Sequence, residues 1–303
     1  MASSTSENLS NAGPLLHTSD DIKNSVKPVE EFRNYVNSDR QEIVYNHYKL
    51  MRSHQTVSFY DRMMEKYSFE QPRAKMSIRE AFVALEGYVD SSDPDVDIPN
   101  IIHMFQTAEG IRKAGHPDWM QLVGLIHDMG KIMYLWGNDE DGQNGTATGA
   151  QWALGGDTWV LGASIPNCTV FPEFNQLNPD MLDSRYNTEY GIYTPNCGLS
   201  SLKFAYGHDE YLYHMVQANN TTIPREGLAM IRFHSLYPWH TGGAYRHLMN
   251  DTDKEMLDWV LEFNKFDLYT KDREGIDLET VRSLWEYYEG LLEKYHLSGQ
   301  LKW

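Results

Sequence analysis

The stretch Pro117-Asp-Trp-Met-Gln-Leu-Val-Gly-Leu-Ile-His-Asp-Met-Gly-Lys-Ile-Met-Tyr-Leu-Trp136 is the most apolar helical run in the chain. Its pattern predicts a buried helix, and three polar side chains interrupt it: His127, Asp128 and Lys131. A carboxylate or ammonium group buried without a partner costs several kcal/mol, so something must compensate for this charge. A cation bound by His127 and Asp128 would do so. An ion pair between Asp128 and Lys131, with His127 as a hydrogen-bonded core residue, would do so equally well.

Four further side chains interrupt apolar helical faces in the same way. They are His103 in Asn100-Ile-Ile-His-Met-Phe, His208 in Ala205-Tyr-Gly-His-Asp-Glu, His234 in Met230-Ile-Arg-Phe-His-Ser and Asp267 in Phe263-Asn-Lys-Phe-Asp-Leu. A single buried histidine is more often a hydrogen-bonded core residue than a ligand. Six such groups on five helical stretches are harder to explain separately, and helical bundles build metal sites in their cores.

The candidate ligands are four imidazoles and two carboxylates, with no thiolate. Such a set suits iron, manganese, zinc or cobalt without selecting among them. Six side chains are too many for one catalytic metal with open positions, but they suit two metals that share a carboxylate, and Asp128 is the natural bridge. His214 and His240 are candidates for supporting hydrogen bonds, whereas we expect His17, His116 and His296 to be solvated.

Helical patterns dominate the rest of the chain, which predicts a mainly α fold with one catalytic domain over residues 29–303. The expected helices lie within 39–66, 77–85, 99–111, 117–136, 200–215, 226–234, 253–266 and 277–295. Ser77-Ile-Arg-Glu80 has a capping-box pattern. Residues 158–170 are rich enough in Val, Ile and Thr to allow one short β-hairpin. Residues 138–149 are expected to be a loop, and residues 1–28 a disordered polar tail.

Composition restricts the classes of partner. The 303 residues carry a formal charge of −17, which disfavours nucleic acid, anionic membranes and phosphorylated small molecules and favours a neutral or cationic substrate. Two cysteines do not form a disulfide framework. The polar N-terminal residues have no secretory pattern, and no apolar stretch is long enough for a bilayer. We therefore expect a cytoplasmic protein that binds neither membrane nor nucleic acid.

Several longer strings resemble the myo-inositol oxygenase family, a variant of the HD-domain fold, and the resemblance extends from Phe32 to Trp303. They are Ser92-Asp-Pro-Asp-Val-Asp, Phe105-Gln-Thr-Ala-Glu-Gly-Ile-Arg-Lys, Leu122-Val-Gly-Leu-Ile-His-Asp, Gly207-His-Asp-Glu-Tyr, Arg232-Phe-His-Ser, Tyr237-Pro-Trp-His-Thr-Gly and Phe263-Asn-Lys-Phe-Asp-Leu-Tyr-Thr-Lys. The resemblance implies a single helical bundle with a di-iron site in its core, mixed-valent Fe(II)/Fe(III) when active. It implies that myo-inositol is cleaved between C1 and C6 with O₂, giving D-glucuronate and water.

The resemblance also assigns residues. It implies that His103, His127, Asp128 and Asp267 hold one iron, and that Asp128, His208 and His234 hold the other. Lys131 would act in catalysis by donating to a substrate oxygen. The implied substrate-binding residues are Arg33, Asp90, Ser91, Ser92, Lys131, Gly156, Asp157, His234, Ser235 and Lys271.

The chain departs from the family pattern in two places. Ser91 stands where an acidic residue is expected, and residues 138–149 are longer and more Gly-rich than expected, which leaves the shape of the nearby lid open. By the same resemblance we expect a monomer that docks transiently to a downstream glucuronate reductase. The strongest rival is an HD-type metal-dependent phosphohydrolase, in which the metals would activate water. A binding module without catalysis would leave six buried ligand-type residues without a purpose.

Overall fold

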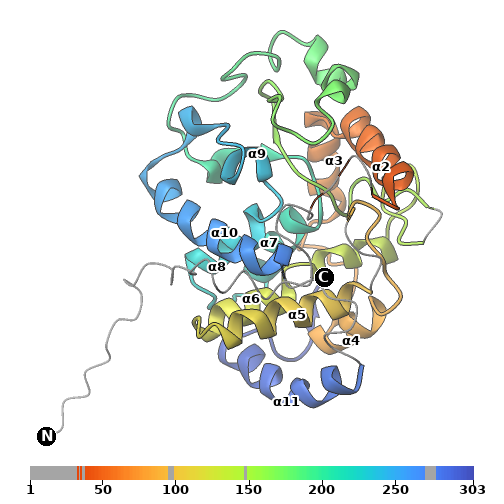
Figure 1. Ribbon diagram of the computed structural model, residues 1–303, viewed down its shortest axis with the longest axis vertical. Coiled ribbons are helices and arrows are strands. Elements are labelled where there is room, and N and C mark those ends of the chain that lie inside the picture. Colours follow the sequence, from red (N-terminus) through yellow and green to blue (C-terminus); the bar gives the residue numbers. More distant parts are fainter. Residues whose placement is uncertain (1–32, 34, 36–37, 95–98, 147–148, 270–277) are drawn as a thin grey trace, which may run out of the picture.

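The computed structural model describes residues 33, 35, 38–94, 99–146, 149–269 and 278–303. The expected disordered tail, residues 1–28, lies outside the described residues. Helices dominate this part of the chain, as the sequence predicts (Figure 1). None of the helices in the described ranges is both long and apolar enough to cross a bilayer.

The helices have the following bounds. The α-helices are α2 (Gln41–His54), α3 (Val57–Lys66), α4 (Ile78–Ala84), α5 (Asn100–Lys113), α6 (Asp118–Ile126), α7 (His208–Ala218), α8 (Arg225–Phe233), α9 (Tyr237–His240), α10 (Asp251–Tyr269) and α11 (Leu278–Lys294). The 3₁₀ helices are η3 (Met129–Leu135), η4 (Pro172–Leu177), η5 (Pro179–Leu182), η6 (Leu199–Ser201) and η7 (Arg246–Leu248).

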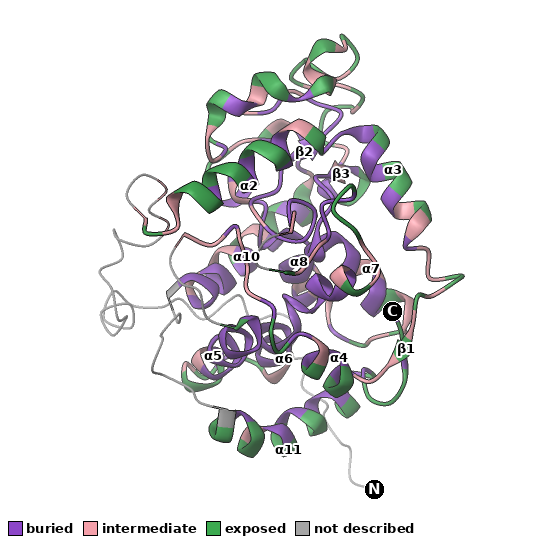
Figure 2. Ribbon diagram, turned by 90° about the vertical axis from the view of Figure 1, so that its right-hand side faces the viewer, coloured by how far each residue is buried: buried purple, intermediate pink, exposed green. Residues whose placement is uncertain are grey.

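Five helices and one 3₁₀ segment pack around the centre of the molecule. α5 lies against α6, α7 packs on α8 and on η3, and α10 contacts α5, α6 and α8. Figure 2 shows these central helices mostly buried, whereas α2 and α11 have exposed outer sides. The buried hydrophobic residues form one continuous cluster that runs from Val44 to Trp303. The polar side chains predicted to bind metal lie on this central group of helices.

Two short antiparallel strand pairs join distant parts of the chain. β1 (Lys75–Met76) pairs with β4 (Leu301–Lys302), and β2 (Val160–Leu161) pairs with β3 (Lys203–Phe204). The expected local hairpin within residues 158–170 is therefore wrong. Strand β2 is real, but its partner lies about forty residues later, because the intervening segment turns through 3₁₀ helices that begin at Pro172 and Pro179.

Two predicted helices begin or divide differently from the expectation. The pattern over 39–66 is two helices, because Thr56 caps the second one with its hydroxyl group, which accepts from Phe59 N at 3.1 Å. Ile43 lies on the outer side of α2 and is 51% exposed. The helix expected over 200–215 begins only at His208, after strand β3. The capping box is confirmed, since Ser77 and Glu80 bond to each other's backbone N–H groups.

The apolar run from Pro117 to Trp136 is divided at its polar centre. α6 ends at Ile126, and 3₁₀ geometry follows, with Lys131 N donating to Asp128 O at 3.0 Å. Gly130 lies where this turn meets the start of α7: a Cβ atom there would lie 1.9 Å from the carbonyl oxygen of His208. The bend therefore turns Asp128 toward α7 and the helices around it.

Candidate metal centre

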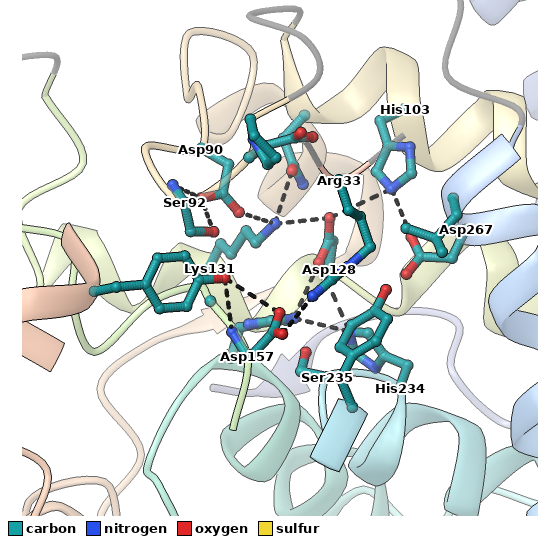
Figure 3. Close-up of a pocket in the computed structure, with 18 of the residues that line it drawn as sticks. Arg33, Asp90, Ser92, His103, Asp128, Lys131, Asp157, His234, Ser235 and Asp267 are labelled. Carbon is teal, nitrogen blue, oxygen red and sulfur yellow. Dashed lines mark hydrogen bonds and ion pairs between the residues drawn. The ribbon is translucent and has the colours of Figure 1, made fainter. Parts of the chain in front are cut away.

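The six predicted ligand side chains converge in the core of the helical bundle. His103 lies in α5, His208 is the first residue of α7 and Asp267 lies in α10. His127 and His234 each follow directly after a helix, α6 and α8. All six residues are buried, with Asp267 the most exposed at 8%. Figure 3 shows the carboxylates of Asp128 and Asp267 and the imidazoles of His103 and His234 around one space.

Two imidazoles and Asp267 gather on one side of Asp128. Asp267 Oδ1 lies 2.9 Å from His103 Nε2 and 3.3 Å from His127 Nε2. The Oδ2 atom of Asp128 faces the same imidazoles, at 3.6 Å from His127 Nε2 and 3.9 Å from His103 Nε2. The ligand atoms of His103, His127 and Asp267 all lie within 4.8 Å of one another.

The other oxygen of Asp128 faces a second pair of imidazoles. Asp128 Oδ1 lies 3.0 Å from His208 Nε2 and 4.0 Å from His234 Nε2, and these two nitrogens are 2.9 Å apart. The ligand atoms of His127, Asp128 and His234 also lie within 4.8 Å of one another. The two oxygens of one carboxylate thus face two donor groups, which is the arrangement that a bridging ligand requires.

Backbone carbonyl groups determine which imidazole nitrogens face this space. His127 Nδ1 lies 2.9 Å from Gly124 O, His208 Nδ1 lies 2.6 Å from Leu154 O and His234 Nδ1 lies 3.0 Å from Ile231 O. A carbonyl oxygen only accepts, so each Nδ1 carries a proton, and in a neutral ring the Nε2 atom then presents a lone pair. His127 Nε2 is buried and has no hydrogen-bond partner among the described residues. These lone pairs face carboxylate oxygens and one another, and a cation between them removes the repulsion.

The pKa shifts of the buried carboxyl groups and of His234 favour the binding of a cation. Burial alone would raise the pKa of Asp128, but Lys131 and the imidazoles of His127 and His208 hold it well below its usual range. Burial would likewise raise the pKa of Asp267, and the adjacent imidazoles of His103 and His127 hold it well below the usual range. Burial, together with the neighbouring imidazoles, lowers the pKa of His234 to about 3. The site therefore presents ionised carboxylates and a neutral His234 imidazole, and this donor set fits a first-row transition metal.

Lys131 links this cluster to a neighbouring carboxylate. Its Nζ atom lies 2.8 Å from Asp128 Oδ2, 2.7 Å from Asp90 Oδ2 and 3.1 Å from Asn100 Oδ1. The ion pair that formed the alternative interpretation of the Asp128 motif is therefore present. It does not replace the metal interpretation, because one ammonium group cannot also account for four imidazoles and a second carboxylate that converge on Asp128.

A pocket of about 90 Å³ opens beside the two donor groups, large enough for several waters. Eight of the residues predicted to bind substrate line it: Arg33, Asp90, Ser92, Lys131, Gly156, Asp157, His234 and Ser235. Arg33 forms an ion pair with Asp157, and its guanidinium lies 3.5 Å from the centre of the Tyr237 ring. The pocket is thus bordered by charged and polar groups on the side opposite the imidazoles (Figure 3).

One predicted substrate-binding residue, Ser91, is placed differently. Ser91 is absent from the described residues that line the pocket, and its hydroxyl group contacts His47 at 2.8 Å. Lys271 lies outside the described residues. Residues 138–146 fold back on α3, where Asp141 forms ion pairs with Arg62 and Lys66 at 2.5 and 2.7 Å.

The sequence assigned no site role to several residues that line this pocket, among them Tyr48, Asn100 and Tyr237. Tyr48 donates to Asp157 Oδ1 at 3.1 Å, and Asn100 and Tyr237 also line the space. Tyr48 shares a helical face with core residues such as Met51, so periodicity alone assigns it to packing. Asn100 directly follows Pro99 and resembles an ordinary first helical residue.

Of the remaining histidines, His240 has the predicted supporting contact, whereas His214 and His116 differ from the prediction. His240 Nε2 donates to His234 O at 3.0 Å and so supports a candidate ligand, as predicted. His214 instead contacts Glu210, at 3.2 Å. His116, expected to be solvated, is buried at 3% exposure, because α6 and α10 cover the turn before α6.

Comparison with known proteins finds related sequences over almost the whole chain. The model of the family described as myo-inositol oxygenase matches residues 41–303. An inositol oxygenase from Mus musculus is 50% identical over 293 residues, which cover 95% of this chain and 96% of that protein. Those from Danio rerio and Dictyostelium discoideum are 48% and 44% identical, over 91% of this chain and 95% and 91% of their own lengths. The matched range contains all six candidate ligands.

Proposed function

The chain belongs to the myo-inositol oxygenase family and is an inositol-cleaving oxygenase, and we propose that it performs this reaction at the site around Asp128. The reaction joins C₆H₁₂O₆ and O₂ to give glucuronic acid, C₆H₁₀O₇, and H₂O. The observation that supports this site most directly is the shared carboxylate: the two oxygens of Asp128 face separate donor groups beside a pocket lined by polar side chains.

We propose two irons as the metals, held by residues of this chain in two sets. The first set is His103, His127, Asp128 and Asp267, and the second is Asp128, His208 and His234. Bound iron, mixed-valent in the active form, would supply Lewis acidity toward a substrate hydroxyl and a redox path by which O₂ takes electrons from the substrate. The nitrogen and oxygen donors support this assignment without excluding other first-row metals.

The pocket residues bind and orient the substrate. Myo-inositol is neutral and carries only hydroxyl groups, so it needs both acceptors and donors. Asp90 and Asp157 offer carboxylate oxygens, while the Lys131 ammonium and the Ser235 hydroxyl can donate. Lys131 is held by Asp90 and Asp128, which raise its pKa against the effect of burial, and so it keeps its proton for a substrate oxygen that gains negative charge.

The decisive experiment is turnover under ¹⁸O₂ in ordinary water. One oxygen of the product carboxylate must carry the label, and consumption of inositol must stop without O₂. A phosphohydrolase would instead take its new oxygen from water and would ignore O₂. Phosphate-ester hydrolysis by zinc-loaded protein, without label from ¹⁸O₂ in the iron-loaded form, would contradict the proposal, because zinc activates water but has no redox chemistry.

A second experiment separates the two roles of Lys131. The Lys131→Ala variant should retain its metal and lose inositol-dependent turnover. If the metal is lost while the remaining loaded enzyme turns over normally, the lysine is only a structural ion-pair partner. The cytoplasmic location, the monomeric state and docking to a glucuronate reductase stay predictions from the sequence.

A further inference from the structure

Two loops that border the pocket both contact the buried imidazole of His47, which lies outside the pocket. His47 of α2 is 5% exposed. Its Nδ1 lies 2.8 Å from the Ser91 hydroxyl group, and its Nε2 lies 3.1 Å from Gly155 O. Ser91 follows Asp90, and Gly155 stands two residues before Asp157. The imidazole therefore bridges the segments that carry the two pocket carboxylates.

The two hydrogen bonds fix the state of the ring. Gly155 O can only accept, so Nε2 carries the proton and donates. In the neutral ring Nδ1 has no proton and accepts from the Ser91 hydroxyl group. Burial lowers the pKa of His47, which is consistent with a neutral ring. Each loop thus needs a different ring nitrogen, and only one tautomer satisfies both.

The loop that contains Gly155 and Gly156 is tightly packed against its neighbours. Gly156 has a φ of +100°, and a Cβ atom there would lie 3.0 Å from His47 Nε2 and 2.9 Å from Met51 Sδ. A Cβ atom on Gly155 would lie 2.7 Å from Asp90 Oδ2. The glycine turn is therefore enclosed between α2 on one side and the Asp90 carboxylate on the other, with the imidazole as a spacer.

We propose that His47 is a positioning residue for substrate binding, which sets the separation of the Asp90 and Asp157 carboxylates by joining Ser91 to Gly155. The inference rests on the proposed function, because it takes these carboxylates as the acceptors of substrate hydroxyls. It also gives Ser91 a role: the family pattern predicts an acidic residue here, and in this chain a hydroxyl group donates to His47. His47 itself is absent from the described residues that line the pocket.

A positioning role for His47 and a packing role predict different effects when the imidazole is removed. The imidazole bonds directly to the segments of the two substrate-binding carboxylates, whereas the ligand His208 is held through Leu154 O, which precedes the bridged residue Gly155. Loss of the bridge should therefore raise KM and leave kcat and metal content nearly unchanged. A merely structural histidine would lower the unfolding midpoint and the amount of active enzyme without raising KM.

The test compares His47→Ala and His47→Gln with His54→Ala, which removes an exposed histidine from the same helix. In iron-loaded protein we expect KM for myo-inositol to rise about tenfold or more in His47→Ala, with kcat within about threefold of wild type. His47→Gln retains a donor and an acceptor and should give a smaller rise. The His47→Gln variant also provides the test of KM if His47→Ala does not fold. The control should keep the wild-type KM.

Hydrogen exchange supplies a readout that does not depend on activity. Amides in peptides covering 88–93 and 154–158 should exchange faster in His47→Ala than in wild type or the control, because both loops lose an anchor. Ser91→Ala should raise KM and add little to the effect of His47→Ala. A His47→Ala variant with wild-type KM and wild-type exchange in both loops overturns the inference. Wild-type protein without O₂-dependent inositol turnover overturns the proposed function instead, and exchange in the loops still tests the bridge.

Discussion

The close approach of Gly130 to α7 allows the fit of the metal centre to be tested with one methyl group. In Gly130→Ala the new Cβ would lie 1.9 Å from the carbonyl oxygen of His208 and 2.8 Å from its Cα. Both neighbours are backbone atoms, so η3 and α7 must separate by about 1.5 Å to reach ordinary contact. Overpacking of this kind costs about 1–3 kcal/mol, and a backbone clash without a flexible neighbour belongs at the upper end, at about 3 kcal/mol.

The same displacement moves His208 relative to Asp128, whose carboxylate lies 3.0 Å from the imidazole. A misplacement of about 1 Å can cost about a hundredfold in rate, so we expect a loss of that order in kcat/KM together with weaker binding of one metal. The assays are urea unfolding, metal content and inositol turnover. Gly290→Ala is the matched control, because no atom lies within 4 Å of its Cβ position in α11. It should stabilise the protein by about 0.5–1 kcal/mol. Wild-type stability and turnover in Gly130→Ala would refute the reasoning.

Three further outcomes follow from the structure. Asp128→Ala should lose both metals, whereas His103→Ala should mainly weaken one; elemental analysis that finds a single metal per chain in active wild type would contradict the bridging role. Arg232→Met removes the cation that contacts buried Glu210 at 2.7 and 2.8 Å, and should lower the free energy of unfolding by about 3–5 kcal/mol, with part of the loss recovered in the double variant with Glu210→Gln. Against the effect of burial, Lys66 and Arg62 lower the pKa of Asp141, so its contribution to stability is present above the ordinary carboxyl range and is lost as pH falls below it. Asp141→Asn should therefore show a smaller loss of stability on acidification than wild type, and equal pH profiles in urea unfolding would count against this assignment.

Periodicity and capping predict the helices well but not their ends. The Ser77 capping box and the start of α5 after Pro99 follow from local chemistry and are confirmed. The division of the first helical pattern at Thr56 depends on one hydroxyl group that accepts from Phe59 N, and apolar spacing does not reveal such a bond. The sequence does not reveal the strand pairing of Val160 with Phe204, because the chain closes this pair over a long irregular connection.

The six candidate ligands could be selected from the sequence because each interrupts an apolar face. A charged or imidazole group at such a position needs a partner, and this requirement is visible without coordinates. The supporting contacts were not visible in the same way. His47 lies on the buried face of α2 with Tyr48 and Met51, so its spacing is that of a core residue. Its function depends on two loops that are distant in sequence, and one sequence alone contains no signal for that contact.

Helices α6 and α8 end at the candidate ligands His127 and His234, so the apolar periodicity of each helix stops at a residue of the site. In a helix that continued through His127, the Gly124 carbonyl would accept from the backbone N–H of residue 128. α6 ends there, and Gly124 O accepts from the side chain of His127 instead, at 2.9 Å. His234 ends α8 in the same way, with its Nδ1 3.0 Å from Ile231 O. The unsatisfied carbonyls of a helix end thus hold both rings in the tautomer whose Nε2 lone pair faces Asp128. Because each helix ends here, the carbonyl groups of Gly124 and Ile231 lie in its last turn and accept from the rings, so the interruption of each helix is part of how the site is built.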